Sequence, residues 1–279
     1  MSTTLIKNKL WFDENAIDPD FIRLHEDLTP KGRIHAPISS ADVLTKFREK
    51  AQNLGLRLVN EKAALKRDGG RFMYVADVES TFNKDYALSV GFRQSSDQSL
   101  AFSGCCGTHV LICQNGVCTA LVKPSKMRHT LGNVNDGCID EKIDLVFERF
   151  SQDADAIRNQ MALMSSTPLT DEILGKFVRM ANGNWKGDRF VKNPLIGSSN
   201  LMRILEELEN PTLNSHEDSS VMRLLNAASY VTTHKIAQRN PSQAMLASRF
   251  ANNLIMSIIK PDFSPLGDVV EAEEVDVGE

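Results

Sequence analysis

Cysteine and histidine, the residues best suited to zinc or nucleophilic chemistry, are concentrated between positions 105 and 129. The dipeptide Asn115-Gly116 favours a two-residue hairpin turn, which would place Cys113 opposite Cys118 in a close cross-strand pair. Together with His129, these two thiols could supply three of the four ligands that zinc prefers. Such cysteines more often serve as small buried apolar residues, so zinc is the weaker interpretation.

The spacing of the other cysteines excludes a larger metal site. Cys105, His109 and Cys113 follow one another at steps of four residues, which on a strand is about 13 Å per step. A cysteine nucleophile would need His109 or His129 within hydrogen-bond reach of its thiolate. The stretch Cys105-Cys106-Gly107 carries no catalytic signature that supports this role, so a cysteine- or zinc-dependent enzyme ranks last.

Other catalytic motifs are absent from the sequence. It contains neither of the glycine-rich phosphate loops, GxGxxG and GxxxxGKS/T, and no HExxH motif of zinc hydrolases. We therefore predict a protein that is not an enzyme and that needs no cofactor.

Basic residues at the ends of predicted strands indicate a different chemistry, the binding of phosphate groups. A basic turn, Lys123–His129, follows the last predicted strand, and Arg93 ends the third. Residues 31–150 hold 17 Lys and Arg against 13 Asp and Glu, a net charge of +4. Cations that follow a phosphate backbone, interleaved with aromatic platforms, are typical of proteins that bind single strands. The alternative, slightly favoured by these residues alone, is a solvated rim of charges around ordinary core aromatics. The predicted contacts are Arg71, Tyr86, Phe92, Arg93, Ser95, Lys123, Lys126, Arg128 and His129.

An antiparallel sheet is expected to position these residues. Five segments have the period of a strand, and Arg67-Asp68-Gly69-Gly70 between the first two is a strong hairpin signal. We predict a meander of about five strands, in which one face can stay exposed to a partner. The predicted strands are residues 56–65, 71–80, 86–92, 100–113 and 117–122.

Helical periodicity precedes and follows this sheet. Ser39 is a suitable N-cap for a helix that ends at Gly55. From Asp140 to Met164, apolar residues recur every three or four positions, which predicts a long amphipathic helix packed on the sheet. Further helices are predicted at residues 170–182, 199–208, 217–238 and 241–259, with a loop at 184–198. The predicted fold class is α+β: an antiparallel β-meander packed on a long helix, followed by a helical C-terminal half.

The chain divides by composition into an N-terminal arm (1–38), a single α+β domain (39–260; sheet-rich 55–123, helical 140–260) and a tail (261–279). No basic residue follows Lys260, whereas seven acids do, which predicts a disordered acidic tail. The overall net charge of −4 argues against a nucleic-acid partner, but residues 1–261 alone hold 32 basic and 29 acidic residues, a net of +3. The tail is predicted to bind a protein partner through Glu271, Glu273, Glu274 and Asp276.

The expected compartment is the cytoplasm. Met1–Leu10 has no secretory signal, and the apolar runs of the chain are too short to span a membrane. The five cysteines do not suggest a disulfide framework. We therefore expect a reduced, soluble protein without a membrane partner.

Four motifs in fixed order resemble a family of uncharacterised phage and plasmid proteins whose members also occur in prophages. They are Tyr86–Asp97, Gly107–Gly116, Arg128–Thr130 and Arg223–His234, so the resemblance covers about residues 40–260. The chain departs from the family at Gln94 and Ser96, where asparagine and histidine are usual. The family has no established activity, and the resemblance implies a mobile-element setting in a bacterial host cell.

Together these observations predict a single-stranded DNA- or RNA-binding protein of a phage or plasmid, acting in replication, recombination or transcription of the element. A homo-oligomer would form through sheet edges or the 1–38 arm. The alternative is a protein-interaction module that inhibits a host defence system or assists a phage polymerase.

Overall fold

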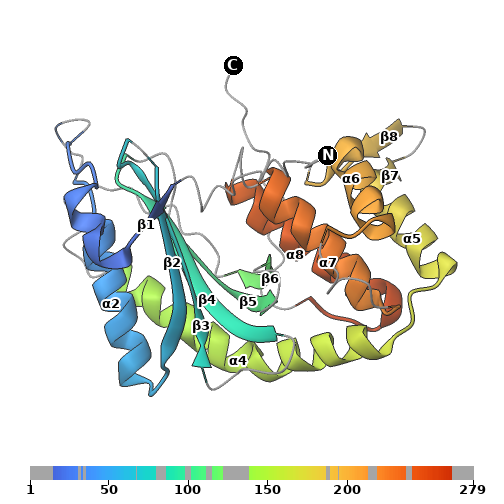
Figure 1. The fold of residues 1–279 in the computed structure, drawn as a ribbon, viewed down its shortest axis with the longest axis horizontal. Coiled ribbons are helices and arrows are strands. Elements are labelled where there is room, and N and C mark those ends of the chain that lie inside the picture. Colours follow the sequence, from blue (N-terminus) through green and yellow to red (C-terminus); the bar gives the residue numbers. More distant parts are fainter. Residues whose placement is uncertain are drawn as a thin grey trace, which may run out of the picture.

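The described part of the chain folds into one six-stranded antiparallel sheet, a separate two-stranded hairpin and a set of helices (Figure 1). This computed structural model describes residues 15–30, 33, 36–66, 68–79, 86–97, 102–110, 115–121, 138–186, 189–193, 195–212, 219–236 and 241–265. The strands follow chain order across the sheet, which confirms the predicted α+β class and the meander. They are β1 (Ala16–Ile17), β2 (Leu58–Leu65), β3 (Arg71–Val78), β4 (Tyr86–Ser95), β5 (Ser103–Val110) and β6 (Asn115–Leu121).

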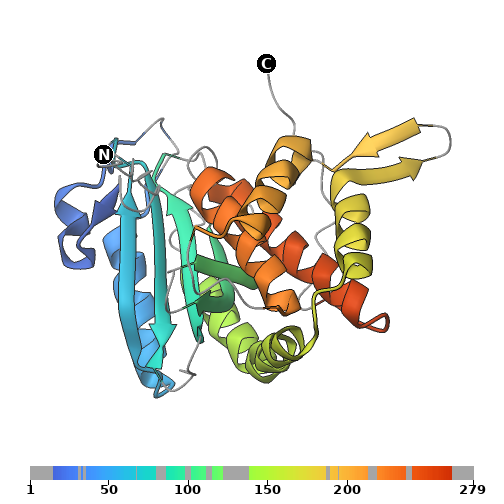
Figure 2. The same ribbon diagram turned by 45° about the vertical axis from the view of Figure 1, so that its right-hand side comes forward.

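The helices lie on both sides of this sheet, with α2 on one side and α7 and α8 on the other (Figures 1 and 2). A 3₁₀ helix, η1 (Pro19–Leu24), precedes α2 (Ser40–Asn53), and a π-helical turn (Thr232–Ile236) follows α7. The remaining helices are α4 (Cys138–Ser166), α5 (Asp171–Asn182), α6 (Gly197–Glu209), α7 (Val221–Val231) and α8 (Pro241–Ile259).

The helix α2 begins and ends where its sequence predicts. The Ser39 hydroxyl accepts a hydrogen bond from the backbone N–H of Asp42 at 3.1 Å, which satisfies one of the free donors at the helix start. Gly55 follows the helix with φ of +70°, a conformation that glycine adopts without strain. Val43 and Phe47 on the inner side of α2 are buried.

The first sheet face, which α2 and α4 cover, carries the aromatic core. On β3, Phe72 and Tyr74 point to this face and are buried, whereas the alternate residues Arg71 and Met73 are half-buried. This alternation is the period-two pattern of a strand with one packed face. The rings of β3 and β4 contact Phe47 of α2, so the helix is fixed over the middle of the sheet.

A second hydrophobic core lies among the helices of the C-terminal half. Met161 and Met164 of α4 are fully buried there with Phe177 of α5 and Leu224 of α7. The N-terminal half of α4 packs instead in the core of the sheet, through residues such as Phe147. One long helix therefore belongs to both cores.

The pairing of β5 with β6 corrects the predicted cysteine pair. Asn115 pairs with Val110 and lies inside β6, so Asn115-Gly116 is not the turn. Cys118 lies opposite Gly107, and Cys113 belongs to residues 111–114, outside the described part. An Asn-Gly dipeptide forms a tight turn only if the flanking strands pair around it, and here Thr108 pairs with Val117, which moves the connection earlier in the chain.

A second correction concerns residues 184–198, which were predicted to be a loop. The chain forms a hairpin there, with β7 (Gly183–Lys186) antiparallel to β8 (Arg189–Lys192). Two residues, Gly187 and Asp188, separate the strands in sequence, and Gly-Asp is a known two-residue hairpin signal. The strands are only four residues long, so the glycine and asparagine around them favoured the loop interpretation.

Candidate nucleic-acid interface

The side of the sheet opposite α2 and α4 combines cations with apolar side chains. Strand register places six half-buried residues from β2, β3, β4 and β5 on this side, and we call them the second sheet face. They are Lys62, Arg71, Met73, Val75, Arg93 and Cys105.

Helix α8 packs against one part of the second sheet face. Met245 and Leu246, near the start of α8, form a small apolar cluster with Met73 and Cys105. The cluster lies beside Arg93, because Met73 and Arg93 are directly opposite one another on β3 and β4. Helix α8 therefore covers the part of the second sheet face formed by Met73 of β3 and Cys105 of β5, and Nε and Nη1 of the neighbouring Arg93 are buried.

Three cations on neighbouring strands make the second sheet face positively charged. Arg71 lies opposite Ser95, and Arg93 lies two residues before Ser95 on β4, so the Cα atoms of the two arginines are diagonal neighbours about 7–8 Å apart. Lys62 lies on β2 opposite Val75. Half-buried guanidinium groups interact with a phosphate more strongly than fully hydrated ones, because the local dielectric constant is lower.

The structure contradicts the predicted stacking platforms. Phe92 is 1% exposed and Tyr86 is 7% exposed, and each belongs to a hydrophobic core. Phe92 alternates with Arg93, so the strand that turns the half-buried arginine toward the second sheet face turns the phenylalanine toward α2. Ser95 is fully buried, so its predicted contact with a strand is also wrong.

Of the predicted nucleic-acid contacts, Arg71 and Arg93 remain, and the structure brings them together on one face. The other predicted site residues lie outside the described residues. They are Lys123, Lys126, Arg128 and His129 of the basic turn, and Glu271, Glu273, Glu274 and Asp276 of the tail.

The zinc site stays a prediction, because Cys113 and His129 also lie outside the described residues. Among the residues that are described, His, Cys, Asp and Glu form no group of three able to hold a metal ion. Cys106 is buried against α4, and burial raises the pKa of its thiol well above the usual range. A thiol that stays protonated at neutral pH is a poor nucleophile and a poor metal ligand.

The buried carboxylate of Asp77, next to the second sheet face, is hydrogen-bonded to Asn60, a residue in a left-handed backbone conformation. Asp77 is 1% exposed and accepts hydrogen bonds from the Ser89 hydroxyl at 2.6 Å and the Asn60 side-chain amide at 3.0 Å. Asn60 has φ of +51°, and the pairing of β2 with β3 shifts between Val59 and Lys62. The carboxylate therefore stabilises the irregularity of β2 that precedes Lys62, and its burial argues against a catalytic role.

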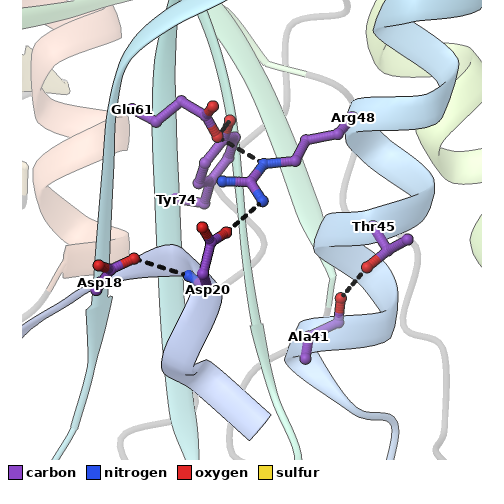
Figure 3. Close-up of polar contacts among 7 residues, drawn as sticks. All are labelled: Asp18, Asp20, Ala41, Thr45, Arg48, Glu61 and Tyr74. Carbon is purple, nitrogen blue, oxygen red and sulfur yellow. Dashed lines mark hydrogen bonds and ion pairs between the residues drawn. The ribbon is translucent and has the colours of Figure 1, made fainter.

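A polar network on the opposite side of the sheet connects four elements, β2, β3, α2 and η1 (Figure 3). The buried Tyr74 hydroxyl donates to Oε2 of Glu61 at 2.6 Å, and Nε of Arg48 donates to the same oxygen at 2.7 Å. Nη1 of Arg48 also donates to Oδ1 of Asp20 in η1, at 3.0 Å. The network fixes the N-terminal arm and α2 to the sheet.

Because the Tyr74 phenol is buried, we expect the protein to lose stability at alkaline pH. Burial, and then the hydrogen bond to Glu61, raise its pKa above the ordinary value near 10. The unfolded chain therefore releases this proton first as pH rises, so the free energy of unfolding falls above about pH 10, by up to ~1.4 kcal/mol per pH unit. We expect Tyr74→Phe to remove this part of the pH dependence in urea unfolding at pH 8–11. An unchanged profile would contradict the buried, protonated phenol.

Comparison with known proteins adds no relative: no family model, no curated protein and no solved structure matches the chain. Within the described ranges, the helices include none that is both long and apolar enough to cross a membrane. We therefore infer the function from the site itself.

Proposed function

We propose that this chain is a non-enzymatic protein that binds single-stranded DNA or RNA across the second sheet face. The observation that carries this proposal is the grouping of Lys62, Arg71 and Arg93 on three neighbouring strands, on the face that α2 and α4 do not cover. A role in replication, recombination or transcription of a phage or plasmid is part of the same proposal.

Binding in this mode is mainly electrostatic, because the predicted aromatic platforms of the sheet are buried in its core. Lys62, Arg71 and Arg93 would contact phosphates, and the apolar parts of the face would contact sugars and bases without selecting a sequence. Each phosphate that is neutralised releases counterions, so affinity must fall steeply as salt rises.

The test is a titration of a fluorescent single-stranded oligonucleotide, followed by anisotropy, at several salt concentrations. We expect tight binding at low salt and a linear fall of log affinity with log salt, with a slope of ~0.7 per phosphate contact. Absence of binding at low salt, or binding that salt does not weaken, would overturn the proposal and would favour a protein partner.

The double variant Arg71→Gln, Arg93→Gln should bind about tenfold or more weakly, and the slope should decrease in magnitude by about 1.4. Lys62→Gln is the milder variant on the same face and should decrease the slope by about 0.7. The matched control is Lys46→Gln, because Lys46 is a half-exposed cation on α2, paired with Asp140 at 2.8 Å. Equal salt slopes in the control and the double variant, with both folded, would show that the second sheet face is not the contact.

A further inference from the structure

The hairpin formed by β7 and β8 lies at the end of the molecule opposite α2 and η1 (Figures 1 and 2). Figure 2 shows its two strands projecting beyond α5 and α6. It shares no strand with the six-stranded sheet.

The base of the hairpin is fixed to the helices on both sides of it. The backbone N–H of Asn193 donates to the carbonyl oxygen of Asn182 at 3.1 Å, which closes the base. The Ser198 hydroxyl of α6 donates to the Asn182 side chain at 3.1 Å. Gly183 begins β7 with φ of +143°, a conformation that favours glycine, so the chain can turn directly from α5 into the strand. The hairpin therefore leaves the body at a defined angle.

The register of the hairpin places residues of one kind opposite each other. Trp185 pairs with Phe190, and Lys186 pairs with Arg189. Directly opposite residues share one face of an antiparallel pair, so the ribbon has one aromatic position and one cationic position on opposite faces near its tip. Lys192 pairs with Gly183 at the base.

The hairpin and the end of α5 are strongly basic. Residues 179–192 contain four basic residues and a single acid, Asp188, although the whole chain is acidic with a net charge of −4. Arg179 and Met180 are exposed on the last turn of α5, directly before the hairpin. A cationic segment around an aromatic pair is complementary to a strand of phosphates with unpaired bases.

We propose that the β7–β8 hairpin is a second contact for a nucleic-acid single strand. Trp185 and Phe190 stack on unpaired bases, and Lys186, Arg189 and Lys192 contact the flanking phosphates. The proposal rests on the proposed function, and it supplies the aromatic platforms that the six-stranded sheet lacks. A strand long enough to occupy both surfaces gains avidity, because the second contact forms at a high effective concentration.

The first experiment uses Trp185 itself as the probe. The chain has two tryptophans, so Trp11→Phe leaves Trp185 as the single emitter. Oligothymidylate is titrated into this variant, and labelled oligothymidylate is followed in parallel by anisotropy. We expect the Trp185 emission to fall and to saturate together with the anisotropy. Anisotropy that reports binding with unchanged emission would overturn the hairpin proposal alone, whereas no binding in either measurement would overturn the proposed function as well.

The second experiment compares matched variants of the complete chain. Trp185→Ala and Phe190→Ala should each weaken binding by roughly five- to a hundredfold, and Lys186→Gln with Arg189→Gln should decrease the salt slope by about 1.4. The control is Phe21→Ala, because Phe21 is 53% exposed on η1 at the other end of the molecule. Wild-type affinity in Trp185→Ala, together with a loss in the Arg71 and Arg93 double variant, would show that the sheet binds and the hairpin does not.

Discussion

Replacing Phe92 with alanine should lower the free energy of unfolding by about 3–5 kcal/mol. Its ring is 1% exposed and lies at the centre of an aromatic group, 5.0 Å from the ring of Phe47 and 5.6 Å from that of Phe72. Truncation removes these contacts and leaves a cavity between the sheet and α2, which the surrounding rings can fill only in part. Urea unfolding followed by circular dichroism measures the effect.

Phe92→Leu separates this core role from a role in base stacking. Leucine keeps most of the buried volume, so the loss of stability should be smaller than for alanine. Because Phe92 faces away from Arg93 and the second sheet face, the affinity for an oligonucleotide should equal that of the wild type. A folded leucine variant that binds tenfold more weakly would show that the ring contacts the strand after all.

Replacing Asp77 with alanine should lower the free energy of unfolding by about 2–4 kcal/mol. The substitution leaves the buried Ser89 hydroxyl without its acceptor, so this group stays desolvated without compensation, and it also removes the acceptor of the exposed Asn60 amide. It also releases the left-handed backbone at Asn60, so the irregular part of β2 loses its anchor.

A double-mutant cycle tests whether this loss comes from the hydrogen bond. Ser89→Ala and Asp77→Ala are measured singly and together by urea unfolding, and we expect a coupling free energy of about 1–3 kcal/mol. Simple additivity would contradict the interaction at 2.6 Å. The matched exposed control is the pair of Arg57 and Glu79, which should couple by less than about 1 kcal/mol.

Helix starts and tight turns that depend on a few adjacent residues could be predicted from the sequence. Ser39 caps α2 as expected, and α5 begins after Thr170, where a helix was predicted to start; each of these two side chains accepts a hydrogen bond from a backbone N–H of the first turn. The turn at Gly69-Gly70 joins β2 to β3 as its dipeptide indicates. These features depend on a few adjacent residues, whose conformational preferences do not require knowledge of the rest of the chain.

The faces of the sheet could not be assigned in the same way. Alternation along β4 shows that Phe92 and Arg93 lie on opposite faces, but not which face α2 will cover. The assignment depends on contacts between Phe47 and β4, which are 45 positions apart in sequence. The strained conformation of Asn60 and the Arg48–Glu61 ion pair likewise depend on partners brought together only by the fold.

The two largest departures from prediction have different causes. Asn115-Gly116 is a strong local signal that long-range pairing of Thr108 with Val117 overrides. At the hairpin, Gly187-Asp188 was a correct signal, but strands of four residues contain too few side chains to establish a period.

The length of α4 has a consequence for how far apart the two proposed contacts lie. This helix has 29 residues, about 44 Å at 1.5 Å per residue, and it packs in the core beneath the sheet at one end and in the helical core at the other. The helix fixes the distance between the sheet and the half of the molecule that carries the hairpin. The number of nucleotides needed to reach both surfaces is therefore set by the protein, so a strand below that length occupies one surface at a time.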